Sequence, residues 1–248
     1  MTAIASPRRP PLCAIAAFVV ALAAVVLVAA AGPAYRVKAV ELPVAFGALR
    51  WGAWLGLGAA IAALIGAWLA RPATGRRGFI LALVAFILGL GVFGAMYAMQ
   101  NGARQAPPIH DVTTDVANPP AFVAVVPLRK AASNPIAYGG PDIARQQQAA
   151  FPDIQPLTLA LPPAAAFARA LAVAHDMGWE IVAEVPAEGR IEATATTAWF
   201  GFKDDIVVRI AAADAGSRVD VRSLSRIGRS DLGKNAARVR AYLKALAG

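Results

Sequence analysis

The chain has 248 residues, a formal net charge of +9 at pH 7 and a hydrophobic content of 58%, which is above that of an ordinary soluble domain. Residues 1–104 hold nine Lys/Arg and one acidic residue (9 − 1 = +8), whereas residues 105–248 hold fifteen and fourteen (15 − 14 = +1). Because the basic residues of the first part flank apolar segments, topology and lipid headgroups explain them, and we expect no nucleic-acid partner. The single cysteine, Cys13, excludes an intrachain disulfide and a cysteine zinc site.

Three uncharged apolar segments predict membrane-spanning helices, at residues 12–31, 51–69 and 79–99. Each is about 20 residues long, the length that crosses a bilayer as a helix. Trp51, Trp54 and Trp68 lie near the ends of the second segment, where interfacial aromatic side chains are enriched. A signal peptide is the alternative for the first segment, because Ala29–Ala31 resembles a cleavage site. We predict a multi-pass protein of the inner (plasma) membrane with residues 1–104 as its membrane domain.

Small residues at four-residue spacing predict close helix packing in this domain. They are Gly52, Gly56 and Gly58 in the second segment, and Gly91 with Ala95 in the third. We favour packing within one chain, with association between two copies as the alternative. No charged residue lies inside a span, which argues against a transport path through the three helices alone.

The distribution of Lys and Arg between the loops predicts the orientation. With the N-terminus inside, the cytoplasmic segments hold Arg8, Arg9, Arg71, Arg76 and Arg77. The outer segments hold Arg36, Lys38, Arg50 and Arg104. The five-to-four balance favours an extracytoplasmic position for everything after the third span.

The rest of the chain predicts an arm followed by an α+β domain. Residues 105–156 are rich in Pro, Asn, Asp and Gly, and their apolar side chains, such as Phe122, predict an arm that packs on the soluble domain. Within residues 157–248 the periodicity predicts a helix at 162–177, strands at 179–185, 191–196 and 205–211, a fourth strand after a turn at 214–216, and a final helix capped by Ser230. We expect a four-stranded antiparallel meander flanked by two helices that cover one sheet face.

Three segments carry a family resemblance: Ile109–Asp115 with Asn118–Phe122, Trp199–Arg209 and Ser217–Asn235. Together they resemble the DUF1499 family, a bacterial and plastid domain of unknown function, over about residues 109–246. The resemblance implies a compact domain that is often carried at a membrane or in an extracytoplasmic compartment. It implies no reaction, ligand or cofactor.

The third segment suggests an anion site, because basic side chains beside free helix N–H groups suit a phosphate or carboxylate. The candidate residues are Arg222, Arg226, Arg229, Ser230 and Asn235. Alternatively, cross-strand ion pairs and a helix cap account for the same residues, and Asp231 at the helix start disfavours an anion.

Two further groups of side chains could form sites. His110, Asp111 and Asp115 could take part in a metal or acid–base site, but no ligand spacing is visible, so turn formation is favoured and no metal or cofactor is expected. The aromatic side chains within residues 199–202 could line a pocket, although a core position is favoured.

These observations favour an extracytoplasmic domain that acts as a non-catalytic accessory or binding module for an envelope component. The expected partners are the lipid bilayer and an anionic envelope ligand or a membrane protein. The sequence contains no recognisable catalytic signature. A membrane-associated enzyme acting on lipid or polysaccharide and a membrane scaffold are the alternatives.

Overall fold

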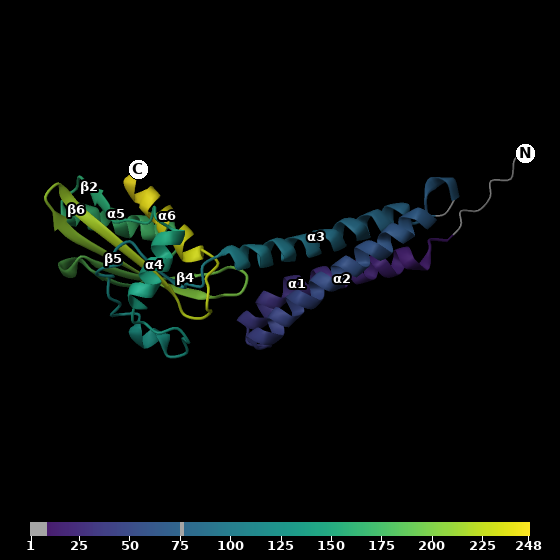
Figure 1. The fold of residues 1–248 in the computed structure, drawn as a ribbon, viewed down its shortest axis with the longest axis horizontal. Helices are drawn as coiled ribbons and strands as arrows, with labels where there is room; N and C mark the ends of the chain where they lie inside the picture. The colour runs from purple at the N-terminus through teal and green to yellow at the C-terminus, as the bar shows by residue number, and fades with distance from the viewer. Residues whose placement is uncertain (1–8, 75–76) are drawn as a thin grey trace, which may run out of the picture. The chain divides into compact units, whose positions relative to one another are not determined.

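The computed structural model describes residues 9–74 and 77–248, so Arg8 and Arg76 of the topology argument lie outside the described residues. The chain divides into two compact units (Figure 1). The first comprises the residues up to Gly102 together with Trp199–Gly201, and the second comprises Ala103–Ala198 and Phe202–Gly248. Each unit is described by itself below.

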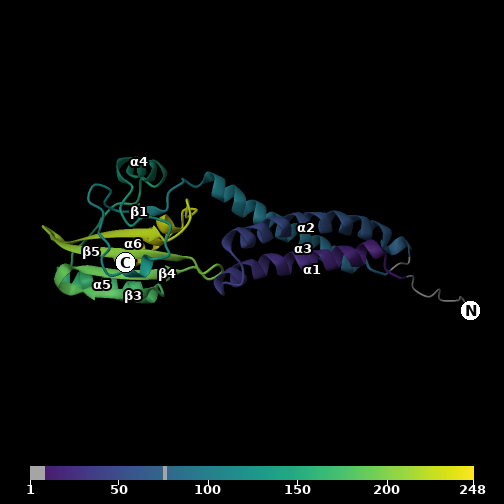
Figure 2. The same cartoon turned by 90° about the horizontal axis from the view of Figure 1, so that it is seen from below.

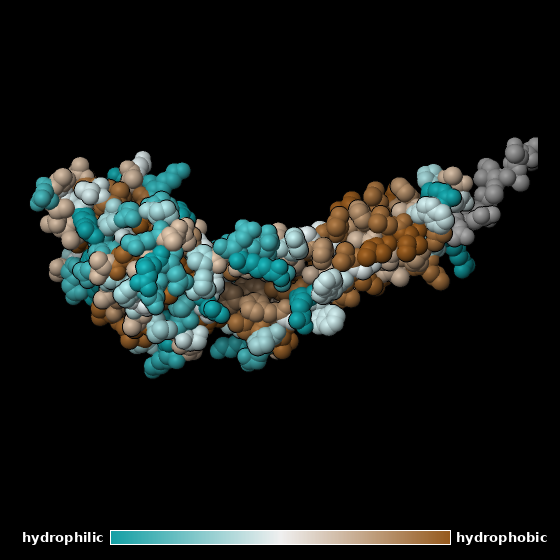
Figure 3. All heavy atoms as spheres, in the orientation of Figure 1, coloured by the Kyte–Doolittle hydropathy of each residue, from teal (hydrophilic) through white to brown (hydrophobic). Residues whose placement is uncertain are grey.

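Three long helices dominate the N-terminal part: α1 (Leu12–Arg36), α2 (Leu42–Leu69) and α3 (Phe79–Gln105), with a short 3-10 turn, η1 (Pro72–Thr74), between α2 and α3. All three are long and apolar enough to cross a membrane, and their visible face is covered by hydrophobic side chains (Figure 3). They extend beyond the predicted spans, most clearly at the start of α2 and the end of α3. Hydropathy marks the part of a helix that suits lipid, whereas backbone hydrogen bonding continues through polar residues such as Arg50 and Arg104.

Small residues allow these helices to approach closely. A Cβ atom on Gly56 would lie 2.7 Å from the carbonyl oxygen of Gly89, and one on Gly66 would lie 2.9 Å from the Cα atom of Ala14. The predicted small-residue contacts therefore occur within one chain at Gly56. Gly58 and Gly91 meet no described atom within 4 Å, so Gly89 rather than Gly91 supplies the contact on the third helix.

The second unit is built on an antiparallel sheet of six strands. The strands are β1 (Asp111–Thr113), β2 (Leu157–Leu159), β3 (Glu180–Val185), β4 (Arg190–Thr196), β5 (Lys203–Ala213) and β6 (Gly216–Ser225). Their order is β1-β6-β5-β4-β3, and β2 also pairs with β6. The predicted meander corresponds to β3–β6, but the predicted count of four strands is wrong. The two additional strands have three residues each, which is too short to produce an alternating pattern that a sequence reader can recognise.

Helices α5 (Pro163–Asp176) and α6 (Lys234–Ala247) lie on one side of the sheet (Figures 1 and 2). The side chains predicted to point inward form the core with them, including Ile206, Val208, Val219 and Val221. The prediction that Ser230 caps α6 is wrong, because the helix begins three residues later than that cap implies, at Lys234 with Gly233 as its N-cap. Leu232 and Gly233 adopt positive φ angles of 57° and 77°, which do not continue a right-handed helix. The side chain of Asp231 accepts the backbone N–H groups of Gly233 and Asn235 instead.

The opposite sheet face is covered by Thr114–Tyr138, which we call the strap. The strap contains the 3-10 helix η2 (Val126–Arg129) and precedes α4 (Gly140–Ala150). Its residues Phe122 and Val125 pack with Val207 and Leu224 in a second, smaller core. The sheet face that carries the ion pairs is therefore largely buried beneath the strap. The helices cover the other face, as expected.

Candidate functional site

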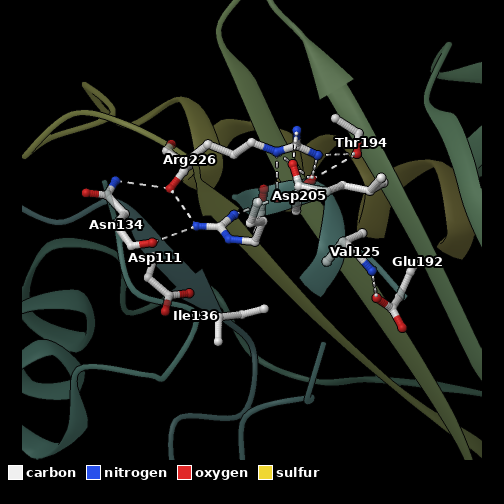
Figure 4. A network of polar contacts seen from close by, with 12 residues as sticks. Asp111, Val125, Asn134, Ile136, Glu192, Thr194, Asp205 and Arg226 are labelled. Carbon is white, nitrogen blue, oxygen red and sulfur yellow. Dashed lines mark hydrogen bonds and ion pairs between the residues drawn. The ribbon is translucent and has the colours of Figure 1, made fainter. Parts of the chain in front are cut away.

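Asp205 is the centre of the polar network beneath the strap (Figure 4). This strand residue is fully buried and accepts a hydrogen bond from Arg129 Nη1 at 2.5 Å. Arg226 Nη2 donates to its other oxygen at 2.8 Å, and the hydroxyl of Thr194 donates at 2.9 Å. One carboxylate is thus shared by two guanidinium groups, one from the strap and one from the chain just after β6. This arrangement fixes the strap on the sheet.

A second buried carboxylate, that of Glu192, holds the strap through its backbone. It accepts the N–H groups of Val123, Ala124 and Val125 at 3.0–3.1 Å, and it also pairs with Arg190. Three consecutive N–H groups converge on one anion because the strap bends into η2 at this point. The Glu192 carboxylate thus binds the backbone of the strap from inside the domain. Its buried negative charge is compensated by these N–H groups and by Arg190.

Arg222 connects β6 with β1 and with two separate parts of the strap, through the carbonyls of Pro120 and Ile136. Its Nε and Nη2 atoms form a bidentate pair with Asp111 at 2.9 and 2.7 Å. Its Cζ atom lies 5.0 Å from the ring centroid of Phe122 and 5.5 Å from that of Tyr138. Burial, with a smaller effect from Asp111, raises the pKa of Tyr138 to about 12. The phenolic oxygen of Tyr138 is buried and has no hydrogen-bond partner among the described residues.

The last group of charges lies where the strap begins. Asp220 accepts hydrogen bonds from Arg209 and Arg218, and both arginines also reach Asp115. The hydroxyl of Thr114 lies 3.4 Å from Asp220. Arg209 and Arg218 therefore pair with an acid of β6 and an acid of the strap.

The five residues of the predicted anion site have very different environments. Arg222 is committed to Asp111, and Arg226 is committed to Asp205 and to the carbonyl oxygen of Leu128. Asn235 is fully buried. Its amide accepts a hydrogen bond from Ser223 and donates to the carbonyl of His110 and to Ser225. These three side chains are used to connect strands, strap and helix.

Ser230 and Arg229 lie in the loop Arg226–Gly233, which we call the β6–α6 loop. The hydroxyl of Ser230 donates to the carbonyl of Pro107 at 3.0 Å and accepts the N–H of Leu232. The backbone carbonyl of Arg229 lies 3.3 Å from His110 Nδ1. The side chain of Arg229 is exposed, and none of the described residues accepts a hydrogen bond from its guanidinium. Of the five candidates, Arg229 is the one whose charged group is available to a ligand.

Asp231 belongs to the same loop, but its charge is directed toward α6. Its two oxygens accept the N–H groups of Gly233 at 2.8 Å and Asn235 at 2.6 Å. Burial raises the pKa of Asp231, and these two hydrogen bonds act in the opposite direction. The Asp231 carboxylate therefore interacts with the N-terminus of α6 and not with the Arg229 side chain. For this reason Asp231 opposes a ligand at Arg229 less than the sequence suggested.

The three residues considered for a metal or acid–base site make other contacts in the structure. His110 contacts the β6–α6 loop, Asp111 pairs with Arg222, and Asp115 pairs with Arg209 and Arg218. Across residues 9–74 and 77–248, no group of three or more His, Cys, Asp or Glu side chains is arranged to hold a metal ion. The three side chains belong to separate contacts within the domain.

Sequence reasoning missed the contribution of the strap to the network. Arg129 and Asn134 were not singled out, yet Arg129 pairs with Asp205, and the Asn134 amide donates to the carbonyls of Ser225 and Gly228 (Figure 4). A local signal existed for Arg129, because it follows the apolar run 121–128 in a segment with few other charges.

Comparison with known proteins adds a family but no activity. Residues 111–246, more than half of the chain, match the family model described as "Protein of unknown function (DUF1499)". No curated protein and no solved structure matched the chain. The matched range covers all six strands, the strap and most of α6.

Proposed function

Because the chain belongs to the DUF1499 family, whose description assigns no activity, we propose its role from its own geometry. It is a non-catalytic accessory protein of the inner membrane of a bacterial cell. Its C-terminal domain lies outside the cytoplasm and binds an anionic component of the cell envelope. Three helices able to cross a membrane support the membrane assignment, and the five-to-four balance of basic residues supports the orientation.

The exposed guanidinium of Arg229 is the observation that carries the proposal. Arg222 and Arg226 are neutralised by Asp111 and Asp205, whereas Arg229 has no acceptor among the described residues. The carbonyl of Arg229 contacts His110, and the adjacent Ser230 is bonded to Pro107, so the loop around Arg229 is held at two points. A guanidinium on a positioned loop can donate two parallel hydrogen bonds to a phosphate or carboxylate.

The state of the buried acids supports binding rather than catalysis. A general acid or base must reach the atom whose proton it transfers. Asp205 and Glu192 are fully buried under the strap and accept hydrogen bonds from arginines and backbone groups of the domain itself. Their role in this proposal is to give the strap and the sheet one fixed conformation, on which the exposed loop is presented.

The test uses the full chain in nanodiscs of phosphatidylcholine, a neutral lipid. The probes are inorganic pyrophosphate, short-chain phosphatidylglycerol and a uronic-acid polysaccharide, with binding measured by thermophoresis. We expect saturable binding of at least one probe that weakens as salt is raised. Arg229→Ala should weaken it about tenfold, since a hydrogen bond to a charged group contributes roughly 1.5–3 kcal/mol.

Lys244→Ala is the matched control, because Lys244 is also exposed and lies in the last turn of α6. It removes the same charge from another part of the domain and should leave the affinity unchanged. Absence of binding to all three probes, or an equal loss in both variants, would contradict the proposal.

A further inference from the structure

We infer that the β6–α6 loop binds the anionic headgroups of the bilayer that carries the chain, with Arg229 as the charged contact and Leu232 as the apolar contact. The inference rests on the proposed function and names its ligand. It follows from three features of the second unit: the connection of this loop to the end of α3, the distribution of charge along the sheet, and the exposure of Leu232.

The β6–α6 loop is bonded to the residues that immediately follow α3. The Ser230 hydroxyl donates to the Pro107 carbonyl, and the N–H of Asp231 donates to the carbonyl of Ile109 at 3.2 Å. Pro107 is two residues beyond the end of α3 at Gln105. The apolar part of α3 ends near Met99, so six helical and two extended residues place Pro107 no more than about 16 Å beyond it.

That distance is comparable with the thickness of the headgroup layer plus one Debye length. Headgroups occupy roughly the outer 5–8 Å of each side of a bilayer. Pro107 therefore lies at most about 8–11 Å beyond the headgroups, which is close to the Debye length of about 8 Å at physiological salt, and the long side chain of an exposed arginine on the bonded loop can span part of that distance. Juxtamembrane basic residues are attracted to anionic lipid for this reason.

Charge is polarised along the strands of the sheet. We call the end of the sheet that is bonded to the residues following α3 the tether end. It includes residues 104–110, 128–134 and 226–234, which meet through hydrogen bonds such as Arg226 Nη1 to the Leu128 carbonyl and Asn134 to the Gly228 carbonyl. They contain one acid, Asp231, whose oxygens are bonded to backbone N–H groups at the start of α6. Their exposed cations are Arg104, Lys130, Arg229 and Lys234. β3 begins at the same end, because Glu180 is opposite Thr194 and pairs with Lys203, so the exposed acids Asp176 and Glu180 offset part of this positive charge.

The turns at the opposite end of the sheet have the opposite character. The β3–β4 and β5–β6 turns lie together there, because the N–H of Ile210 donates to the carbonyl of Gly189. Glu184, Glu188 and Asp214 are exposed at this end, and the partly exposed Arg218 there is paired with Asp115 and Asp220. An anionic bilayer surface therefore attracts the tether end and repels the far end, which gives the domain one preferred orientation.

Leu232 supplies an apolar contact beside the cation. The residue is 44% exposed, and its backbone has a φ of 57°, a conformation that a leucine rarely adopts. The loop holds this conformation through the Ser230 hydroxyl, which accepts the N–H of Leu232, and through the Asp231 carboxylate. An exposed leucine next to an exposed arginine matches the boundary between acyl chains and headgroups, where one contact is apolar and the other is charged.

The experiment measures how close the loop lies to lipid in the full chain. Cys13→Ala removes the native thiol, and Leu232→Cys or Asp214→Cys then carries a fluorophore. Asp214 is the matched position, because it lies in the turn before β6, whereas Leu232 follows the other end of this ten-residue strand, about 30 Å away. Nanodiscs of phosphatidylcholine, with or without phosphatidylglycerol, contain a trace of headgroup nitroxide lipid as the quencher.

We expect quenching at position 232 to be at least about twice as strong with phosphatidylglycerol as without it. In about 0.5 M salt, which shortens the Debye length to roughly 4 Å, quenching should fall to the level seen in phosphatidylcholine alone. Quenching at position 214 should stay low in both lipids. Adding Arg229→Ala should remove the effect of phosphatidylglycerol at position 232, and Arg229→Lys should retain most of it.

Equal quenching at the two positions, or no effect of phosphatidylglycerol, would overturn the inference. Inorganic phosphate, added at constant ionic strength, tests whether the ligand is a lipid headgroup or free phosphate. If free phosphate abolishes the effect of phosphatidylglycerol, the loop binds free phosphate, and the inference is also overturned. If the soluble probes bind through Arg229 while lipid quenching is absent, the proposed function stands and only this inference fails.

Discussion

Arg129 and Asp205 form an ion pair of 2.5 Å in which the two side chains are 5% and 0% exposed. They are 76 positions apart, and one belongs to the strap while the other belongs to a central strand. A buried carboxylate requires such compensation, and loss of one partner leaves the other charge unpaired in a poorly solvated site. The position of the strap therefore depends on the carboxylate of Asp205, which is buried and cannot be reached by a ligand.

Asp205→Asn should lower the free energy of unfolding of the C-terminal domain by about 3–5 kcal/mol, because Arg129 loses its buried countercharge. Denaturant unfolding of the full chain in detergent measures this change. The control is Asp142→Asn, which breaks an ion pair between side chains that are 78% and 72% exposed and should change stability by less than about 1 kcal/mol. Similar losses in the two variants would contradict this account of the strap.

Glu192→Ala should release the first part of the strap while β5 and β6 stay folded. The N–H groups of Val123, Ala124 and Val125 all lose their acceptor, so their hydrogen exchange should accelerate by at least about tenfold, as expected when a net stabilisation of roughly 1.5 kcal/mol is lost. Glu184→Ala removes an exposed carboxylate from the neighbouring strand and is the control. Unchanged exchange in the Glu192 variant would show that other contacts hold the strap.

The strands that repeat an alternating pattern could be predicted from the sequence, and those that depend on distant contacts could not. Ile206, Val208, Val219 and Val221 point toward the helices as expected, because a strand in a half-apolar environment reveals its register. The pairing of Val112 with Ser223 in β1 leaves no comparable trace in three residues.

The candidate site was less predictable than the sheet for the same reason. Arg222, Arg226 and Arg229 look alike in the sequence, but their partners come from the strap and from other strands. No local pattern indicates that Asp111 and Asp205 neutralise the first two. What could be anticipated was the turn at Gly228, whose φ of 95° suits glycine and lets the chain leave β6 next to Arg229.

The raised pKa of Asp231 predicts a pH dependence of stability. Burial raises this pKa above its ordinary value of 3.8, so the folded domain binds the proton more tightly than the unfolded chain does. The associated stabilisation is complete below about pH 4 and is lost as the pH rises through the raised value. Asp231→Asn removes this titration.

The difference in unfolding free energy, Asp231→Asn minus wild type, should therefore increase between about pH 4 and about pH 7, and denaturant unfolding at several pH values measures it. Asp153→Asn is the comparison, because a hydrogen bond from Arg240 lowers the pKa of Asp153. Its difference from wild type should decrease with rising pH, and should do so mainly below about pH 4–5, because the stabilisation from a lowered pKa is complete above the unfolded value of 3.8. A flat or decreasing difference for the Asp231 variant would contradict the assigned burial effect.

The orientation of the chain has its own test. Reporter fusions after Arg104 and at Gly248 should behave as extracytoplasmic, since three spans follow an N-terminus that the balance of basic residues places inside. A phosphatase reporter active only after export and a fluorescent reporter active only in the cytoplasm give opposite readings. Strong cytoplasmic fluorescence at Gly248 would refute the predicted topology.

The most direct test of anion binding through Arg229 is to identify what the chain retains from its own membrane. Wild type, Arg229→Ala and Lys244→Ala are each extracted in polymer-bounded native membrane particles, and the small molecules that copurify are compared by mass spectrometry. The account predicts that an anionic component is enriched with wild type and with Lys244→Ala, and that the enrichment falls about tenfold in Arg229→Ala. Identical profiles for all three proteins would contradict it.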